Sequence, residues 1–405
     1  MTDQQPRPPK RGFFAGLSPE VVRLGLVSFF ADVSSEMLYP ITPIFLASVL
    51  HAPVEAIGLI EGIAEAVASL FKSVFGHISD RTGKRKPFVL AGYTIAALSK
   101  PLIAVAQTWP LVLVARTADR FGKGMRTSPR DALLADYTKP QERARAFGWH
   151  RAMDSAGAVV GPLLALLLIS ATNSNLRLVI ALTVIPGLIG AVLVLTVRES
   201  RVAGKRAAAG ERPAPIPMRQ MPRPFLTYLV AWAPFALANS SDIFLILRAK
   251  QLGYSTTLTI LLYTTYNLVY TLSSPVFGHL ADWLGRRQVL IGGLGVFALV
   301  YLGFAAVRVP GWLWMLFAVY GLYIAATDGV GKAYAIELVP ASVRATAVGL
   351  LGTVTGVATL VASTAAGVLW QQVGPWAAFV FGTAGSLVAA AVLLVAPVLR
   401  HASAA

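Results

Sequence analysis

The sequence of 405 residues contains no cysteine and few charged side chains. The absence of cysteine excludes a disulfide framework, thiol catalysis and cysteine-ligated metals. Charged residues make up 13% of the chain and hydrophobic residues 56%, whereas a typical soluble domain carries about 25% charge. An ordinary water-soluble enzyme and a disordered tail are therefore excluded. The five histidines are scattered and form no paired metal motif, so we expect no bound metal and no cofactor.

Long apolar runs separated by short loops take up most of the chain. A helix that spans a bilayer needs about 20 mainly apolar residues, and hydropathy is the observation on which the assignment rests. The predicted spans lie near residues 22–50, 54–77, 87–107, 109–136, 144–170, 176–197, 225–250, 256–280, 288–307, 310–337, 344–370 and 375–398. The sequence therefore predicts an all-α membrane protein with twelve transmembrane helices embedded in a lipid bilayer.

One polar segment divides the predicted helices into two groups. Residues 198–224 are rich in Arg, Pro and Ala, which is typical of a linker. This linker separates an N-terminal six-helix bundle at 22–197 from a C-terminal six-helix bundle at 225–398, with short tails at 1–21 and 399–405. No feature of the sequence fixes the oligomeric state, and a monomer is compatible with all of them.

The charges are unbalanced, with a net charge of +16. An excess of this kind is found in nucleic-acid-binding proteins, but here the basic residues lie in short clusters between apolar runs, so we expect no nucleic-acid partner. One set of loops holds most of the Lys and Arg, and the opposite set holds only Arg177, Arg248, Lys250 and Arg308. Because basic loops remain in the cytoplasm, we expect both termini and the linker to be cytoplasmic, in a bacterial-type inner membrane.

The two halves of the chain resemble each other at a shift of about 200 residues. The repeat predicts two pseudo-symmetric bundles. Repeated six-helix halves are the architecture of transporters whose binding site lies at the interface between the repeats. The matching segments are 76–85 with 278–287, 34–36 with 240–242, and 143–148 with 344–349.

The loop between the second and third predicted helices carries the most specific motif. Residues 76–86 have the pattern Gly-x-x-x-Asp-Arg-x-Gly-Lys-Arg-Lys, which resembles the signature loop of the major facilitator superfamily. Its echo at 278–287 has Trp283 in place of the first basic residue. The resemblance covers all twelve helices and implies a transporter that binds a small molecule and performs no catalysis.

Three weaker motifs support the same resemblance. Gly157-x-x-x-Gly161-Pro162 in the fifth helix and Arg120-x-x-Lys123-Gly124 in the fourth are similar to motifs of the drug/proton antiporter branch of this superfamily. Residues 198–201, Arg-Glu-Ser-Arg, resemble an element at the end of the family's sixth helix.

The resemblance implies that the signature loop and its echo form a latch at the cytoplasmic face. Glycines let the helices approach and the chain turn, Asp80 can cap the N-terminus of an opposing helix, and the basic residues can pair with acids such as Asp136 or Glu142. A plain anchor of basic residues at a membrane face is the simpler alternative. The predicted latch residues are Gly76, Asp80, Arg81, Gly83, Lys84, Arg85, Gly278, Asp282, Gly285 and Arg286.

Two pairs of acidic residues lie inside predicted spans. An ionisable residue costs about 3 kcal/mol or more at the centre of a span and is functional by default. The first helix carries Asp32 and Glu36, and the second carries Glu61 and Glu65, each pair one helical turn apart. Burial and a neighbouring carboxylate both make a carboxyl group harder to ionise. Both pairs are therefore candidates for proton or cation coupling, with Asp32 and Glu36 foremost because the family's first helix lines the cavity.

The fourth predicted helix carries a stripe of cations. Arg116, Arg120, Lys123 and Arg130 fall within about 80° of arc on one face. In a structural interpretation the stripe pairs with the four carboxylates of the first two helices and neutralises buried charge. In a functional interpretation the outer members, Arg116 and Arg120, face the cavity and attract an anionic group of the substrate.

Other polar residues complete the predicted site. Lys100 lies near mid-depth as a charge partner, and together with Lys72 it is a structural alternative partner for the second-helix carboxylates. Asp242 occupies the position that corresponds to Glu36 in the other half, where it can bind substrate or form a hydrogen bond with Ser240 or Asn239. The predicted substrate cavity comprises Arg116, Asp119, Arg120, Asp154, Asp242 and Asn267.

The sequence therefore predicts a secondary active transporter that moves a small organic solute across the inner membrane by alternating access, with proton-coupled export. Uptake or exchange of an organic anion or a metal chelate is the alternative that the cationic stripe favours. Two other classes are an intramembrane enzyme, which the lack of cysteine and of a paired-histidine motif disfavours, and a transporter-like sensor that binds ligand without flux.

Overall fold

The computed structural model describes residues 17–139, 142–200, 221–340 and 343–396. These residues form α-helices joined by short loops, with no β-strand among them. Most of the tail predicted for 1–21, linker residues 201–220 and the tail at 399–405 lie outside the described residues.

The first half of the chain forms six rods, two of which are broken into two helices. The breaks follow Leu38 and Leu182. The rods are α1 (Pro19–Leu38) with α2 (Ile41–Ser48), α3 (Val54–Thr82), α4 (Lys86–Ala104), α5 (Trp109–Asp136), α6 (Arg143–Ala171), and α7 (Leu176–Leu182) with α8 (Val184–Thr196).

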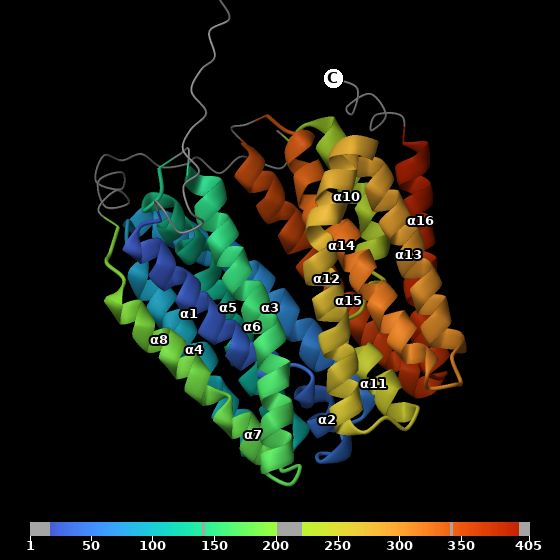
Figure 1. The fold of residues 1–405 in the computed structure, drawn as a ribbon. Coiled ribbons are helices and arrows are strands. Elements are labelled where there is room, and N and C mark those ends of the chain that lie inside the picture. The colour runs from blue at the N-terminus through green and yellow to red at the C-terminus, as the bar shows by residue number, and fades with distance from the viewer. Residues whose placement is uncertain (1–16, 140–141, 201–220, 341–342, 397–405) are drawn as a thin grey trace, which may run out of the picture.

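The second half repeats this arrangement, and the two bundles stand side by side in Figure 1. Its first rod is broken between Ala236 and Ile243. The rods are α10 (Arg223–Ala236) with α11 (Ile243–Gln251), α12 (Thr256–Leu284), α13 (Arg286–Ala306), α14 (Trp312–Glu337), α15 (Arg344–Gln372) and α16 (Pro375–Val395).

Each predicted span coincides with one rod, so the predicted all-α membrane fold is confirmed. Among the described residues, seven rods, including α7 with α8, are long and apolar enough to cross a membrane, judged by length and composition. The other rods are interrupted or carry charged and hydroxyl side chains, which lower the mean hydropathy of the span. The break between α1 and α2 falls at Tyr39 and Pro40.

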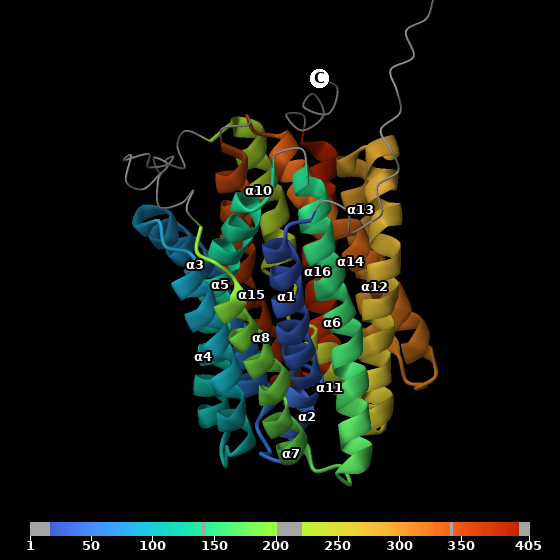
Figure 2. The same ribbon diagram turned by 60° about the vertical axis from the view of Figure 1, so that its left-hand side comes forward.

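The helix order places the start of α1 and the end of α16 at one end of the molecule, the upper end in Figures 1 and 2. We call this end the terminal face and the opposite end, where α2, α7 and α11 lie, the far face. The few basic residues of the far face cap helix ends: Arg177 donates to the carbonyls of Ala104 (2.8 Å) and Ala106 (2.6 Å), and Arg248 to those of Phe304 and Val307.

The two bundles touch along a seam between α3 and α15 that glycines keep narrow. A Cβ atom added to Gly62 would lie 2.9 Å from Leu360 Cα, and one added to Gly367 would lie 2.9 Å from Glu55 Cα. Nearer the terminal face, the hydroxyls of Ser73 and Thr353 lie 3.3 Å apart. The α3–α15 seam is therefore closed over most of its length.

We expect Gly58→Ala to destabilise the transmembrane bundle, because the added Cβ would overlap the carbonyl oxygen of Ser363 on α15. Overpacking of this kind costs about 1–3 kcal/mol. Thermal unfolding in detergent, followed by tryptophan fluorescence, measures the effect. Gly292→Ala on α13 is the matched control, since nothing lies within 4 Å of its added Cβ; equal stability of the two variants would contradict the close packing.

Candidate functional site

A cavity of about 570 Å³ lies between the two bundles. It extends from Val348, in the second turn of α15 at the terminal face, to Asp242 at the start of α11, and its walls come from α3, α5, α10, α14 and α15. We call it the central cavity. Its aromatic lining consists of Tyr228, Trp232, Phe235, Tyr320 and Tyr323.

The inner end of the central cavity is formed by Asp242 and two tyrosines. The carboxylate of Asp242 accepts hydrogen bonds from the hydroxyls of Tyr320 (2.5 Å) and Tyr266 (2.9 Å). Asp242 also stands at the N-terminus of α11, where the helix dipole stabilises a negative charge. The predicted placement of Asp242 in the cavity agrees with the structure, but its partners are these tyrosines rather than Ser240 or Asn239.

Between the central cavity and the far face, hydrogen bonds join the two bundles. Tyr263 of α12 donates to the carboxylate of Glu36 at the end of α1 (2.5 Å). The hydroxyls of Tyr39 and Ser241 share a hydrogen bond of 3.1 Å. Since the lining of the central cavity reaches the first turns of α15, the cavity is accessible from the terminal face and closed beneath Asp242.

The glycine motif of α6 packs against the two acidic residues of α1. A Cβ added to Gly157 would lie 2.8 Å from Asp32 Cβ, and one added to Gly161 would lie 2.9 Å from Glu36 Cβ. The motif therefore brings α6 against the face of α1 that carries both carboxylates. Among the described residues, Asp32 makes no hydrogen bond or ion pair.

The cationic stripe of α5 is largely neutralised within the N-terminal bundle. The Arg116 guanidinium donates to both carboxylate oxygens of Glu61 at 2.6–2.9 Å and lies 3.4 Å from Asp119. Arg120 lies 3.3 Å from Glu65. For Arg116 and Arg120 the structural interpretation therefore holds, because both neutralise carboxylates of α3. Neither arginine lines the central cavity, so the prediction that they face the substrate cavity is wrong.

Two lysines of the central cavity make no ion pair in the described residues. Lys72 of α3 and Lys123 of α5 line it together with Glu65. Neither lysine makes an ion pair or hydrogen bond with its ammonium group in the described ranges. The sequence placed Lys123 in the stripe but gave no reason to separate it from the arginines, and Lys72 had been considered only as a partner of the second-helix carboxylates.

Of the residues predicted for the substrate cavity, Asp119, Asp154 and Asn267 also lie outside the lining of the central cavity, as does the predicted charge partner Lys100. Lys100 is buried in the N-terminal bundle, where its ammonium group donates to Ser34. Asp154 lies 3.4 Å from His150 on α6, and the Asn267 side chain donates to the Tyr263 carbonyl (3.1 Å). Each of them is held by a neighbour within its own bundle.

The model of the Major Facilitator Superfamily matches residues 24–255 and 225–404, so it covers both halves. This chain belongs to the Major Facilitator Superfamily. It is therefore a membrane transport protein and not an enzyme. An uncharacterised MFS-type transporter of Methanocaldococcus jannaschii is 34% identical over 384 residues, which are 93% of this chain and 95% of the relative.

Other similarities are more distant. The multidrug resistance protein MdtH of Photorhabdus laumondii is 30% identical over 128 residues, 32% of either chain. Among solved structures, the nucleoside transporter NupG has a TM-score of 0.75 at 14% identity, covering 93% of this chain and 99% of that one. A POT family transporter in complex with 5-aminolevulinic acid has a TM-score of 0.76 at 12% identity, covering 95% and 97%. At these identities the structures show the fold alone.

The signature loops of this transporter form similar ion-pair clusters in the two halves, through arginines that lie one position apart in the repeat. Arg85 lies 3.1 Å from Asp80 and 2.8 Å from Asp136, the last residue of α5. Arg286 lies 2.9 Å from Glu337, the last residue of α14, and 3.6 Å from Asp282. In the described part of the chain these pairs connect helices of one bundle. A latch between the bundles stays a prediction for another conformation.

The carboxylate that caps α4 is that of Glu199. Asp80, which was expected to cap a helix N-terminus, pairs with Arg85 instead. Glu199 accepts hydrogen bonds from the backbone amides of Arg85 (3.1 Å) and Lys86 (3.1 Å) at the start of α4. The Arg-Glu-Ser-Arg element after α8 thus ties the end of the bundle to the signature loop.

The glycines of the two loops do different things. Gly83 has φ +65° and Gly285 has φ +93°, so both adopt positive-φ conformations that favour glycine, at the points where the chain was expected to turn. Gly76 allows α3 to approach Ser128 of α5, whereas nothing lies within 4 Å of a Cβ added to Gly278. Close approach at Gly278 is therefore a wrong expectation.

Proposed function

We propose that this transporter exchanges a small organic solute for protons and exports it across a bacterial-type inner membrane, with the terminal face in the cytoplasm. The basic residues of the terminal loops support this orientation, and the similarity to a multidrug resistance protein over a third of the chain supports export. The solute enters the central cavity from the terminal face and leaves when the far face opens, as alternating access requires.

The observation that carries the proposal is the hydrogen bond between Glu36 and Tyr263. It joins α1 to α12 across the two bundles at the closed end of the cavity. An ionised carboxylate accepts a stronger hydrogen bond than a neutral one, so gain or loss of a proton at Glu36 changes a contact between the bundles. Asp32, one turn away and without a partner in the described residues, is the second proton carrier.

The lining of the central cavity favours a solute that is aromatic or apolar over most of its surface and carries an anionic group. The aromatic side chains supply the apolar contact. Lys72 and Lys123 supply positive charge that the described residues leave unpaired, and Asp242 stands at the opposite, inner end.

The second candidate is proton-coupled uptake of an organic anion or a metal chelate. The two lysines favour it, because they attract anions that approach from either side. Export and uptake make opposite predictions for the same pH gradient, so the direction of net flux decides between them.

We expect accumulation of solute in proteoliposomes whose terminal face points outward and whose lumen is acidic. In this geometry protons leave the lumen and an exchanger carries solute inward. A panel of organic solutes is assayed with the gradient, without it, and with an ionophore that dissipates it. Depletion of the lumen under the same gradient would establish uptake, and gradient-independent flux would contradict proton coupling.

A further inference from the structure

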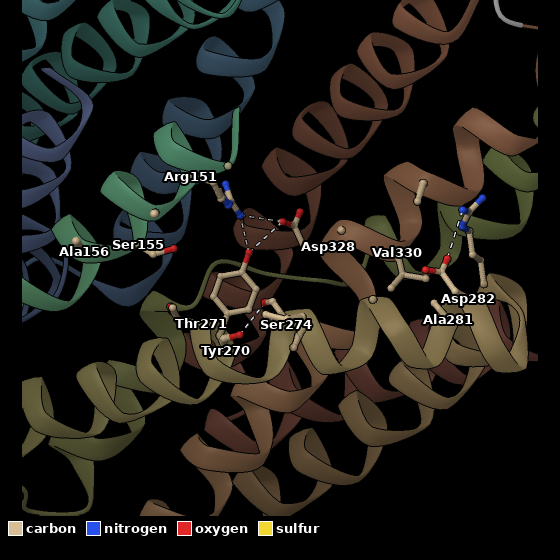
Figure 3. A pocket seen from close by; sticks show the side chains of 18 of the residues that line it. Arg151, Ser155, Ala156, Tyr270, Thr271, Ser274, Ala281, Asp282, Asp328 and Val330 are labelled. Carbon is tan, nitrogen blue, oxygen red and sulfur yellow. Dashed lines mark hydrogen bonds and ion pairs between the residues drawn. The ribbon is translucent and has the colours of Figure 1, made fainter. Parts of the chain in front are cut away.

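A second cavity, of about 770 Å³, lies between α6 and α12, outside the central cavity. Its walls are the terminal-face halves of α6 and α12 together with α14. Small and apolar side chains such as Ala152, Ala156, Val159 and Pro275 make up most of the lining. We call it the lateral cavity; Figure 3 shows it from close by.

The lateral cavity exists because α6 and α12 lie farther apart at the terminal face than α3 and α15 do along their seam. Glycines close the α3–α15 seam, whereas Gly148 of α6, Gly278 of α12 and Gly329 of α14 have nothing within 4 Å of an added Cβ. All three line the lateral cavity. Side chains are thus missing where the helices diverge, and the space is large enough for a ligand of ordinary size, for which cavities are about 300–1,000 Å³.

One wall of the lateral cavity carries a cluster of charges. Arg151 of α6 donates to the Tyr270 hydroxyl (2.7 Å) and lies 3.6 Å from Asp328 of α14. Lys332, which lines the central cavity, lies 2.6 Å from the same carboxylate. Two cations on opposite sides of Asp328 therefore share its carboxylate, and Asp328 can remain paired with Lys332 when Arg151 binds a ligand. The Arg151 side chain is 61% exposed, and Figure 3 shows the cluster of Arg151, Tyr270 and Asp328 at the wall.

The same cluster separates the two cavities. Asp328 lines both the lateral and the central cavity. Among the ion pairs of the described residues, Arg151–Asp328 is the one that joins the two bundles. A ligand that drew Arg151 away from Asp328 would therefore remove a side-chain contact between the cavities and a link between the bundles.

We propose that the lateral cavity binds a single-chain amphiphile with an anionic carboxylate head, which enters from the membrane leaflet at the terminal face. The head pairs with Arg151 while Asp328 keeps its ion pair with Lys332, and the chain lies along the apolar walls of α6 and α12. This inference deepens the proposed function, on which it rests, by naming the substrate class. A small hydrophilic anion would leave the apolar walls unused, and a neutral chain would leave the charge of Arg151 unused.

The test is photolabelling of the full-length protein in proteoliposomes with a dodecanoate that carries a diazirine on its chain. We expect labelled peptides from the α6 and α12 segments that line the lateral cavity. Unlabelled dodecanoate should compete, while butyrate and dodecanol at the same concentration should not. Competition by butyrate equal to that by dodecanoate, equal competition by dodecanol, or labelling confined to other helices would overturn the proposal.

Variants of the charge cluster make the test specific. Arg151→Gln should weaken the competition by dodecanoate at least about tenfold, because a charge-assisted contact is lost. Asp328→Asn should strengthen it, because Arg151 loses its competing carboxylate. Loss of structure cannot raise affinity, so opposite signs separate a binding site from misfolding. Reduced or unchanged affinity in Asp328→Asn, or unchanged affinity in Arg151→Gln, would contradict the proposed head-group site.

A pair of glycine substitutions tests the location. Gly148→Leu places a side chain in the lateral cavity and should abolish labelling, whereas Gly292→Leu on α13, also open around its Cβ, should not. Equal labelling of the two variants would place the ligand elsewhere. Labelling needs no flux, so a bound amphiphile without proton-coupled transport would refute only the proposed function, and coupled transport without labelling would refute only the lateral site.

Discussion

Glu36→Gln should abolish the dependence of solute accumulation on the pH gradient and retain solute binding. The amide cannot take up or release a proton in the physiological range, although its oxygen can still accept the hydrogen bond from Tyr263. One pH unit corresponds to about 1.4 kcal/mol, so exchange of one proton per solute drives up to about tenfold accumulation in the wild type. The variant should show a ratio near one. Proteoliposome flux with and without the gradient, beside equilibrium binding, measures both quantities.

Two further variants define what the first result means. Glu55→Gln removes an exposed carboxylate of α3 near the far face and should leave coupling unchanged. Tyr263→Phe removes the hydrogen-bond donor and keeps the carboxyl group, so it should weaken coupling and loosen the closed far face, because protonation of Glu36 then no longer changes a contact between the bundles. Full proton dependence in Glu36→Gln would remove this residue from the coupling mechanism and leave Asp32 as the carrier to examine.

Glu61→Leu or Arg116→Met alone should destabilise the N-terminal bundle by about 3–5 kcal/mol, because each leaves an unpaired charge in the interior. The two side chains are 0% and 2% exposed and bonded through both carboxylate oxygens. The double variant should recover most of the loss, since an apolar pair of similar volume replaces a desolvated ion pair at little cost. Unfolding in mixed micelles with increasing SDS measures all three.

The control for the ion pair is the contact between Glu20 and Arg23, at 3.7 Å, whose side chains are 15% and 40% exposed. Glu20→Leu should cost less than about 1 kcal/mol, as is typical of surface pairs. Additive losses in the Glu61/Arg116 double variant would show that the two side chains act independently, against the bidentate geometry.

The sequence predicted the helices well because each long apolar run ends at a short polar or turn-forming segment. It also singled out Glu36, which contacts the other bundle, and Asp242, which lines the central cavity, since both are costly inside a span and occupy matching positions in the two halves. The partners could not be predicted in the same way. Helical periodicity places Arg116 on one face of α5, but whether that face meets Glu61 or an open cavity depends on how α3 and α5 pack.

The same limit explains the errors at the terminal face. Asp80 and Glu199 are both carboxylates near the start of α4, and loop composition does not show which of them reaches the amides of Arg85 and Lys86. The pair formed by Arg151 and Asp328 joins residues 177 positions apart in different bundles. Neither residue belongs to a motif, so only the folded arrangement reveals their proximity.

The closed seam between α3 and α15 has a mechanical consequence. Rigid bodies that remain in contact along one edge rotate about that edge, and displacement grows with distance from the axis. We expect any rotation of one bundle about this seam to displace the helices on the opposite edge, α6 and α12, the farthest. Because the width of the gap between them follows the rotation most closely, a molecule lodged there would act as a wedge that sets how far the rotation proceeds.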